Sequence, residues 1–122
     1  MRKIKEIMVV DDEAGIRRLL ADILSGEGFK VTLAKDGQDS LDQMQEHRFD
    51  LLITDINMPR VDGIELLKRM KREGRPEKVI VMSANFIEEK CLGEEDILPV
   101  FSRLNKPFQI RNFLEVVSSA LG

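Results

Sequence analysis

The stretch Leu51-Leu52-Ile53-Thr54-Asp55-Ile56-Asn57-Met58-Pro59 decides the fold, because a short apolar run ends in it abruptly and polar residues follow. A nearly continuous apolar run of this length is typical of a strand buried on both faces, as in a parallel sheet. Three further runs of this kind are expected to be strands: Ile7–Val10, Val31–Ala34 and Val79–Met82. A fifth strand is expected at Pro99–Leu104, where Pro99 favours an edge position or a strand start.

Segments with the period of an amphipathic helix lie between these strands. Apolar residues recur at helical spacing near both ends of the chain, at Ile16, Leu19, Leu20, Ile23 and Leu24 and again at Ile110, Phe113, Leu114 and Val117. Shorter segments around Leu41 and Leu67 follow the same period, and a short or irregular fourth helix is expected between Asn85 and Leu98. Strand and helix thus alternate five times, which predicts a single α/β domain over residues 1–122, a doubly wound parallel sheet with five helices.

Composition excludes several classes of protein. The chain has 122 residues, and its 19 basic and 22 acidic side chains leave a net charge of -3, which argues against a direct nucleic-acid binder. No apolar run is long enough to span a membrane or to form a signal peptide, and the single cysteine cannot form an intrachain disulfide. The protein is therefore expected to be cytoplasmic, with no membrane partner.

Polar residues follow four of the five expected strands, in the motifs Asp11-Asp12-Glu13, Asp55-Ile56-Asn57, Ser83-Ala84-Asn85 and Asn105-Lys106-Pro107. Doubly wound sheets bind ligands outside the carboxyl ends of their strands. Carboxylates gathered there repel one another unless a cation lies among them, and an all-oxygen cluster suits Mg²⁺. A lysine and a hydroxyl on the other side can receive an anion, so the set predicts a site for a phosphoryl group bridged to a metal.

The order and spacing of these motifs resemble the receiver domain of two-component response regulators, over essentially the whole chain. The residues that carry the resemblance are Asp11-Asp12, Asp55 with Met58-Pro59 and Asp62-Gly63, Ser83-Ala84, and Lys106-Pro107-Phe108. The resemblance implies a flavodoxin-like fold with strand order 2-1-3-4-5. It also implies a cis peptide bond between Lys106 and Pro107.

The same resemblance implies a role for each site residue. Asp55 would accept a phosphoryl group from a sensor histidine kinase or a phosphotransfer protein. Mg²⁺ would be held by Asp12, the Asp55 side chain and the backbone carbonyl of Asn57, with Asp11 acting through a bound water. Lys106 and Ser83 would contact the phosphoryl group and couple it to a face formed by the fourth helix, fifth strand and fifth helix, which would bind a downstream protein.

The chain departs from the family pattern near the fifth strand. Where receivers usually carry an aromatic switch residue, three positions before the lysine, this sequence has Arg103. Phe101 is expected to share a face with Arg103, because side chains alternate along a strand. We expect Arg103 to be an exposed charge that contacts the partner, and Asn57 and Asn85 to influence how long the phosphoryl group survives.

Two other functions remain as alternatives. A Mg²⁺-dependent aspartyl phosphohydrolase would use Asp55 as nucleophile in a similar D-x-N arrangement, but Asn57 cannot donate a proton as a carboxylic acid would. A degenerate receiver would be a constitutive interaction module, which the full set of acids and lysine disfavours. The favoured hypothesis is a phosphorylated switch that is not an enzyme. It would catalyse only its own phosphorylation and dephosphorylation.

Overall fold

The computed structural model of the protein describes residues 3–84 and 95–122. Within these ranges the elements follow in the order β1 (Glu6–Val10), α1 (Ala14–Gly26), β2 (Lys30–Ala34), α2 (Gly37–Met44), β3 (Leu51–Asp55), α3 (Gly63–Arg72), β4 (Lys78–Ser83), β5 (Ser102–Asn105) and α5 (Ile110–Leu121). The described ranges thus hold four of the five expected helices; the predicted fourth helix falls largely on residues 85–94, outside them, and residues 95–97 form a turn and a bend. No helix in the described ranges is long and apolar enough to cross a membrane.

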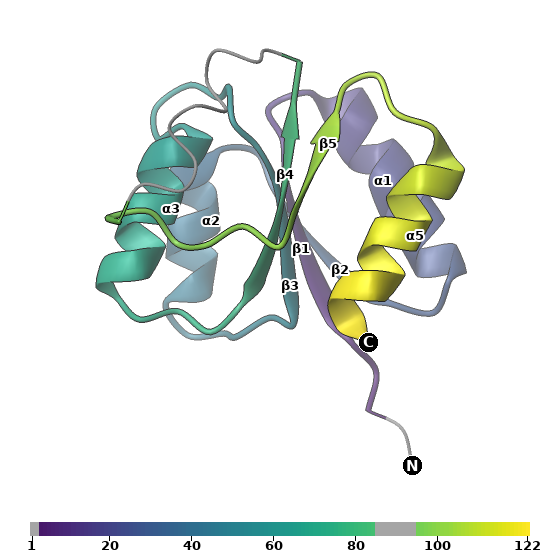
Figure 1. The fold of residues 1–122 in the computed structure, drawn as a ribbon, viewed down its shortest axis with the longest axis horizontal. Helices are drawn as coiled ribbons and strands as arrows, with labels where there is room; N and C mark the ends of the chain where they lie inside the picture. Colours follow the sequence, from purple (N-terminus) through teal and green to yellow (C-terminus); the bar gives the residue numbers. More distant parts are fainter. Residues whose placement is uncertain (1–2, 85–94) are drawn as a thin grey trace.

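All five strands are parallel and pair in the order β2-β1-β3-β4-β5, which confirms the predicted doubly wound sheet (Figure 1). The register places Val9 of β1 opposite Leu33 of β2 and Ile53 of β3. The strand order reverses between β1 and β3. A ligand site is therefore expected beyond the carboxyl ends of these two central strands.

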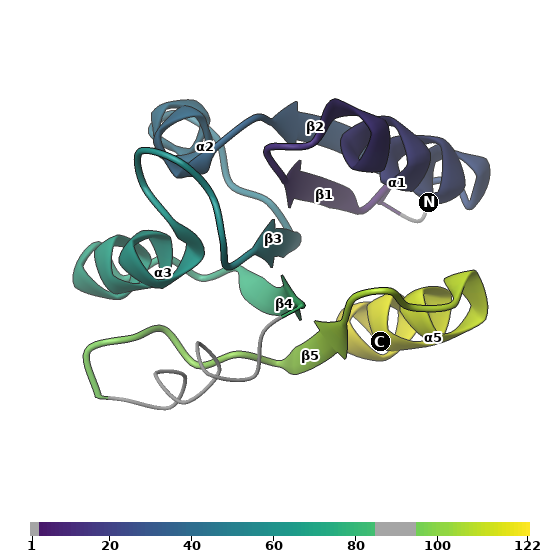
Figure 2. The same ribbon diagram turned by 90° about the horizontal axis from the view of Figure 1, so that it is seen from above.

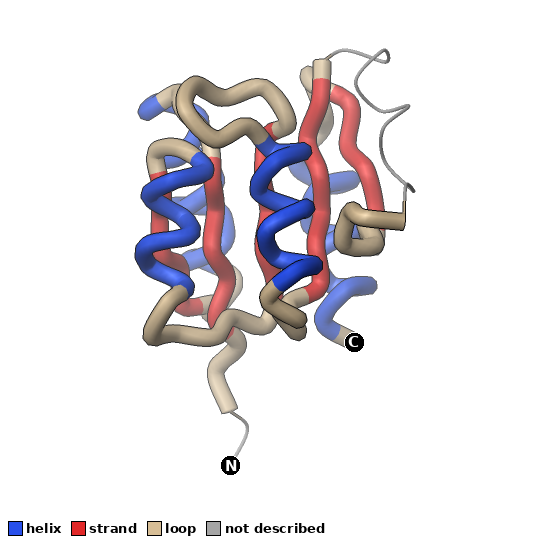
Figure 3. Tube along the Cα trace, turned by 90° about the vertical axis from the view of Figure 1, so that its left-hand side faces the viewer, coloured by secondary structure: helices blue, strands red, loops and turns tan. Residues whose placement is uncertain are grey.

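Helices cover both faces of the sheet, with α1 and α5 on one side and α2 and α3 on the other (Figure 2). Figure 3 is viewed from the side of α2 and α3, which stand in front of the strands. The apolar residues of β1 alternate between two core clusters: Met8 and Val10 belong to the cluster with α2 and α3, and Ile7 and Val9 to the cluster with α1 and α5. The apolar runs of β1, β3 and β4 are buried throughout, as their composition predicted. The run Val31–Ala34 is not, because β2 lies at the edge of the sheet: only Ala34 is buried there, and Leu33 is 38% exposed.

Two aspartates fix where α2 and α3 begin. The Asp36 and Asp62 side chains accept hydrogen bonds of 2.8 Å from the backbone N–H groups of Asp39 and Glu65, respectively. Each satisfies one of the N–H groups that a helix start leaves without a partner. The chain turns after α1 at Gly28, whose φ of 90° favours glycine.

The last strand is shorter and later than its apolar pattern predicted. Pairing with β4 begins at Phe101, whose N–H donates to the Val79 carbonyl at 2.8 Å, and the strand spans Ser102–Asn105 instead of residues 99–104. Pro99 has no N–H to contribute to a ladder. The preceding segment packs instead through Ile97, which is 2% exposed and joins the core cluster beside α3. The predicted edge position of this strand is confirmed.

Candidate metal and anion site

Four of the predicted site residues lie at the carboxyl edge of the sheet, the upper edge in Figure 1. Asp11 directly follows β1, Asp55 and Ser83 are the last residues of β3 and β4, and Lys106 directly follows β5. Parallel strands bring their carboxyl ends to one edge, which is why residues so far apart in sequence meet here.

Lys106 bridges two of the carboxylates. Its Nζ donates to Asp11 Oδ2 at 2.9 Å and to Asp55 Oδ2 at 2.8 Å. The three side chains are 15%, 0% and 9% exposed, respectively, so water screens their charges only weakly. Burial on its own lowers the pKa of Lys106, but the hydrogen bonds and negative charges of Asp55 and Asp11 outweigh burial and raise this pKa above its ordinary value. Lys106 is therefore a firmly protonated cation in the site.

The backbone orients both buried carboxylates. Asp11 Oδ1 accepts the N–H of Glu13 at 2.9 Å, and Asp55 Oδ1 accepts the N–H of Asn57 at 3.1 Å. Each carboxylate therefore has one oxygen held by the backbone and the other in contact with Lys106. The guanidinium of Arg17 donates to the Asp11 carbonyl at 2.6 Å, a contact that the sequence did not predict because the helical pattern of α1 shows only which residues face the core.

Three carboxylates could hold a metal ion. Asp11, Asp12 and Asp55 each offer a carboxylate oxygen, and these oxygens all lie within 4.8 Å of one another. Asp12 is exposed, unlike the other two, so the cluster opens to solvent on its side. An octahedral Mg²⁺ ion binds oxygens at about 2.1 Å and usually keeps several waters. The residues therefore fit such an ion, with solvent able to complete its coordination.

A close backbone approach fixes the loop that follows Asp55. The N–H of Gly63 donates to the Ile56 carbonyl at 2.8 Å. A Cβ atom at Gly63 would lie 2.5 Å from the Asp55 carbonyl oxygen and 2.7 Å from the Ile56 Cα, so only glycine fits. The sequence motif included Gly63 but did not show that it packs against the backbone of Asp55.

Ser83 and Lys106 are joined through the main chain. Ser83 is 1% exposed, and its carbonyl accepts the N–H of Lys106 at 2.8 Å. The peptide bond between Lys106 and Pro107 is cis, as the resemblance implied. The hydrogen bond between the two main chains brings the hydroxyl-bearing residue of β4 and the lysine after β5 to the same part of the edge.

The remaining predicted residues lie away from the carboxylates or outside the described ranges. Phe101 is 46% exposed, and Lys78 Nζ lies 5.5 Å from the centre of its ring. Arg103 is an exposed residue of β5, opposite Val81 of β4. Asn85 lies outside the described residues. The Phe101 ring is therefore partly solvated and not buried as a switch aromatic is when it turns inward.

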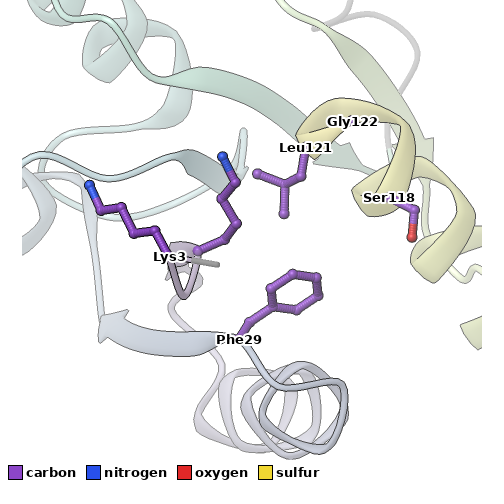
Figure 4. A pocket seen from close by; sticks show the side chains of 6 residues that line it. Lys3, Phe29, Ser118, Leu121 and Gly122 are labelled. Carbon is purple, nitrogen blue, oxygen red and sulfur yellow. The ribbon is translucent and has the colours of Figure 1, made fainter. Parts of the chain in front are cut away.

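A cavity of about 680 Å³ lies at the opposite edge of the sheet, where β1 and β2 begin and α5 ends (Figure 4). It is lined by Lys3, Lys5, Phe29, Ser118, Leu121 and Gly122. Among the described residues, no carboxylate side chain and none of the predicted site residues lines it. Its size alone does not make it the chemical site.

The fold and the site define a class: doubly wound α/β proteins that gather carboxylates and a lysine at the switch point of a parallel sheet. The family profile of the response regulator receiver domain matches residues 7–118. The chain therefore belongs to that family and is a receiver domain of two-component response regulators.

Individual relatives support the same family assignment. Sporulation initiation phosphotransferase F of Bacillus subtilis is 36% identical over 117 residues, which cover 96% of this chain and 94% of that protein. The transcriptional regulatory protein FixJ of Bradyrhizobium diazoefficiens is also 36% identical, but the match covers 94% of this chain and only 56% of FixJ. The response regulator TrrA of Thermotoga maritima, solved in complex with Mg²⁺-BeF, is 28% identical with a TM-score of 0.81, over 97% of this chain and 100% of that one.

Proposed function

We propose that Asp55 is the phosphoacceptor of this receiver domain and that its phosphorylation requires Mg²⁺. The observation that carries the proposal is the contact of Lys106 with both Asp11 and Asp55, beside a cluster of three carboxylates at the carboxyl edge of the sheet. This arrangement provides negative ligands for a cation and a positive group for a phosphoryl oxygen at one place. The Mg²⁺-BeF complex of TrrA, a relative of the same fold, supports the proposal.

The metal would be held by Asp12, the Asp55 carboxylate and the backbone carbonyl of Asn57, with Asp11 acting through a water molecule. When bound, Mg²⁺ offsets the negative charge on the phosphoryl oxygens. Asp12 is the exposed member of the cluster. It is the carboxylate that can reach a partly hydrated ion without leaving a buried hydrogen bond.

In the transfer step, an Asp55 carboxylate oxygen attacks phosphorus as the P–N bond of a phosphohistidine breaks. The electron pair of that bond returns to the imidazole nitrogen, so an acyl phosphate forms on Asp55 and the histidine is regenerated. Lys106 would then turn its charge to the phosphoryl oxygens, and the Ser83 hydroxyl would donate to one of them. The histidine donor would belong to a sensor kinase or a phosphotransfer protein.

The output is binding of a downstream protein, not turnover of a substrate. In this proposal the domain works in the cytoplasm without direct contact with nucleic acid or membrane, and catalyses only its own phosphorylation and dephosphorylation. The surface formed by β5, α5 and the segment where the fourth helix is expected would contact the target. Arg103 would supply an exposed charge there, Phe101 would adjoin it, and Asn85 with Asn57 would influence the lifetime of the acyl phosphate.

Intact mass spectrometry tests the proposal. Incubation with Mg²⁺ and acetyl phosphate should add one base-labile phosphoryl group to the wild-type protein, and none to Asp55→Asn or to wild-type protein in EDTA. Phosphorylation that persists in Asp55→Asn would place the acceptor elsewhere. Asp12→Ala should weaken Mg²⁺ binding in a calorimetric titration, and unchanged affinity would remove Asp12 from the ligand set. Steady turnover of a phosphate ester would favour the phosphohydrolase alternative instead.

A further inference from the structure

The loop between β3 and α3, residues 56–62, contains an unusual backbone conformation. Arg60 has a φ of 69°, in the left-handed region that residues with a Cβ rarely adopt. Glycine would adopt this conformation without steric cost. Such strain persists where surrounding contacts hold it, and it gathers at functional sites. Contacts of Arg60 or of its neighbours must therefore hold the backbone in this conformation.

The Arg60 side chain pairs with a nearly buried carboxylate at the start of α2. Its guanidinium Nη1 lies 3.3 Å from Asp36 Oδ2, and the Asp36 side chain is only 5% exposed. The other oxygen of Asp36 is already used, because Oδ1 caps α2 through the N–H of Asp39. Among the described residues, Arg60 is the cation paired with Asp36, and its own side chain is 57% exposed.

A second contact joins the same loop to α2. The N–H of Gly37 donates to the Val61 carbonyl at 3.1 Å. A Cβ atom at Gly37 would collide with that carbonyl oxygen and would lie 2.8 Å from the Val61 Cβ, so the two backbones touch. Consecutive loop residues, Arg60 and Val61, are therefore both fastened to the first residues of α2.

The other end of the loop carries Asn57. Its N–H is held by Asp55 Oδ1, and Gly63 closes the loop through the Ile56 carbonyl. The hydrogen bonds of Asn57 and Gly63 hold the two ends of the loop and do not reach its middle. The contacts of Arg60 and Val61 with α2 hold the middle in place. The position of the Asn57 carbonyl thus depends on contacts on the far side of the loop from the carboxylates.

We propose that Arg60 is a positioning residue: its ion pair with Asp36 holds the loop in the conformation that presents the Asn57 carbonyl to the bound cation. The inference rests on the proposed function of the site. Without the ion pair, the left-handed backbone at residue 60 loses its compensation and other loop conformations become populated. The apparent affinity for Mg²⁺ is the intrinsic affinity multiplied by the fraction of molecules whose loop presents the Asn57 carbonyl, so it falls as that fraction falls.

The test uses four single variants, the double variant Arg60→Ala/Asp36→Asn, and two measurements. Arg60→Ala removes the pair and keeps the unfavourable backbone. Asp36→Asn removes the charge but keeps an oxygen that can cap α2, and Arg60→Lys restores a cation. Arg69→Ala is the matched control, because it removes a half-exposed ion pair with Glu65 on α3. Hydrogen exchange of the loop amides is measured in EDTA, and Mg²⁺ affinity is measured by calorimetry.

Arg60→Ala and Asp36→Asn should each weaken Mg²⁺ binding by a factor of up to about 5, the limit that an ion pair worth about 1 kcal/mol sets on the loss of the binding-competent loop. Both should speed exchange of the Asn57 amide in the metal-free protein. The double variant should bind no more weakly than either single one, and Arg60→Lys should recover most of the affinity. Arg69→Ala should change neither quantity.

Unchanged Mg²⁺ affinity in Arg60→Ala and Asp36→Asn would overturn the proposal, even if both variants unfold more easily, because the pair would then only stabilise the fold. Unchanged loop exchange would also overturn it. A wild-type protein that binds no Mg²⁺ would refute the proposed function itself. In that case the exchange measurement would still decide whether the ion pair holds the loop.

Discussion

Replacing Lys106 with methionine should destabilise the metal-free protein. The substitution keeps an unbranched side chain but removes the charge that lies 2.9 Å from Asp11 Oδ2 and 2.8 Å from Asp55 Oδ2. The carboxylate oxygens of these residues lie within 4.8 Å of each other, and two unit charges at that separation repel by roughly 3 kcal/mol at an effective dielectric constant of about 20. This repulsion is present in both proteins, but only the wild type has Lys106 to offset it. Removing one partner of a buried ion pair typically costs about 3–5 kcal/mol, so we expect Lys106→Met to lower the free energy of unfolding by about 3 kcal/mol in EDTA at pH 7.

Added Mg²⁺ should then reverse the effect. In the wild-type protein a metal ion must compete with Lys106 for the same carboxylates, whereas in Lys106→Met it meets carboxylates without a cation. Mg²⁺ should therefore stabilise the variant more than the wild type. This protein has no tryptophan or tyrosine, so urea unfolding is followed by circular dichroism.

Lys78→Met is the matched control, because Lys78 donates to the Ala120 carbonyl and has no carboxylate partner among the contacts described. It should shift the unfolding midpoint far less than Lys106→Met. Equal midpoints for wild type and Lys106→Met in EDTA would refute the reasoning. So would an equal gain in stability from Mg²⁺ in both proteins.

Three further predictions follow from contacts around the site and the core. Gly63→Ala should cost about 1–3 kcal/mol and slow phosphorylation, because the new Cβ would lie 2.5 Å from the Asp55 carbonyl oxygen; unfolding curves and the rate of mass gain check both effects. Glu77→Gln should lower stability by about 2 kcal/mol, since the side chain is 0% exposed and pairs with a guanidinium while accepting the Phe49 N–H; an unchanged urea midpoint would contradict this. Although burial lowers the pKa of Lys106, its carboxylate partners raise it overall. The ion pairs therefore contribute their full stability below about pH 10.4, the ordinary lysine pKa. This stability should be lost as the pH rises through the higher pKa of Lys106 in the folded protein. Thermal unfolding of the wild type should show the loss, and thermal unfolding of Lys106→Met should not.

The sequence predicted β1, β3 and β4 well because burial on both faces leaves a continuous apolar run. Runs such as Ile7–Val10 and Val79–Met82 lie within β1 and β4, which extend one residue or so beyond them. Both edge strands, β2 and β5, have mixed burial patterns, and of the two only β5 has bounds that its apolar pattern misplaced. Apolar residues before it, such as Ile97, pack against α3 without joining the sheet.

The members of the site were also predictable, but their contacts were not. Asp11, Asp55 and Lys106 each end or follow an expected strand of a parallel sheet, and this alone predicts that they lie at one edge. That Lys106 itself would neutralise two of the acids depends on side-chain reach across a sequence separation of 95 residues, which no local pattern encodes. The pairing of Arg60 with Asp36 likewise depends on how a loop meets a helix that lies earlier in the chain.

The first and last described residues, Lys3 and Gly122, line one cavity at the edge of the sheet opposite the carboxylates (Figure 4). A tag, a fluorescent protein or another domain joined to either end would therefore be tethered on the side away from Asp55. Such fusions should leave the phosphoacceptor accessible to a donor protein. This placement of the two ends is compatible with joining the domain to other domains. In the relative FixJ, the matching segment is about half of a longer polypeptide.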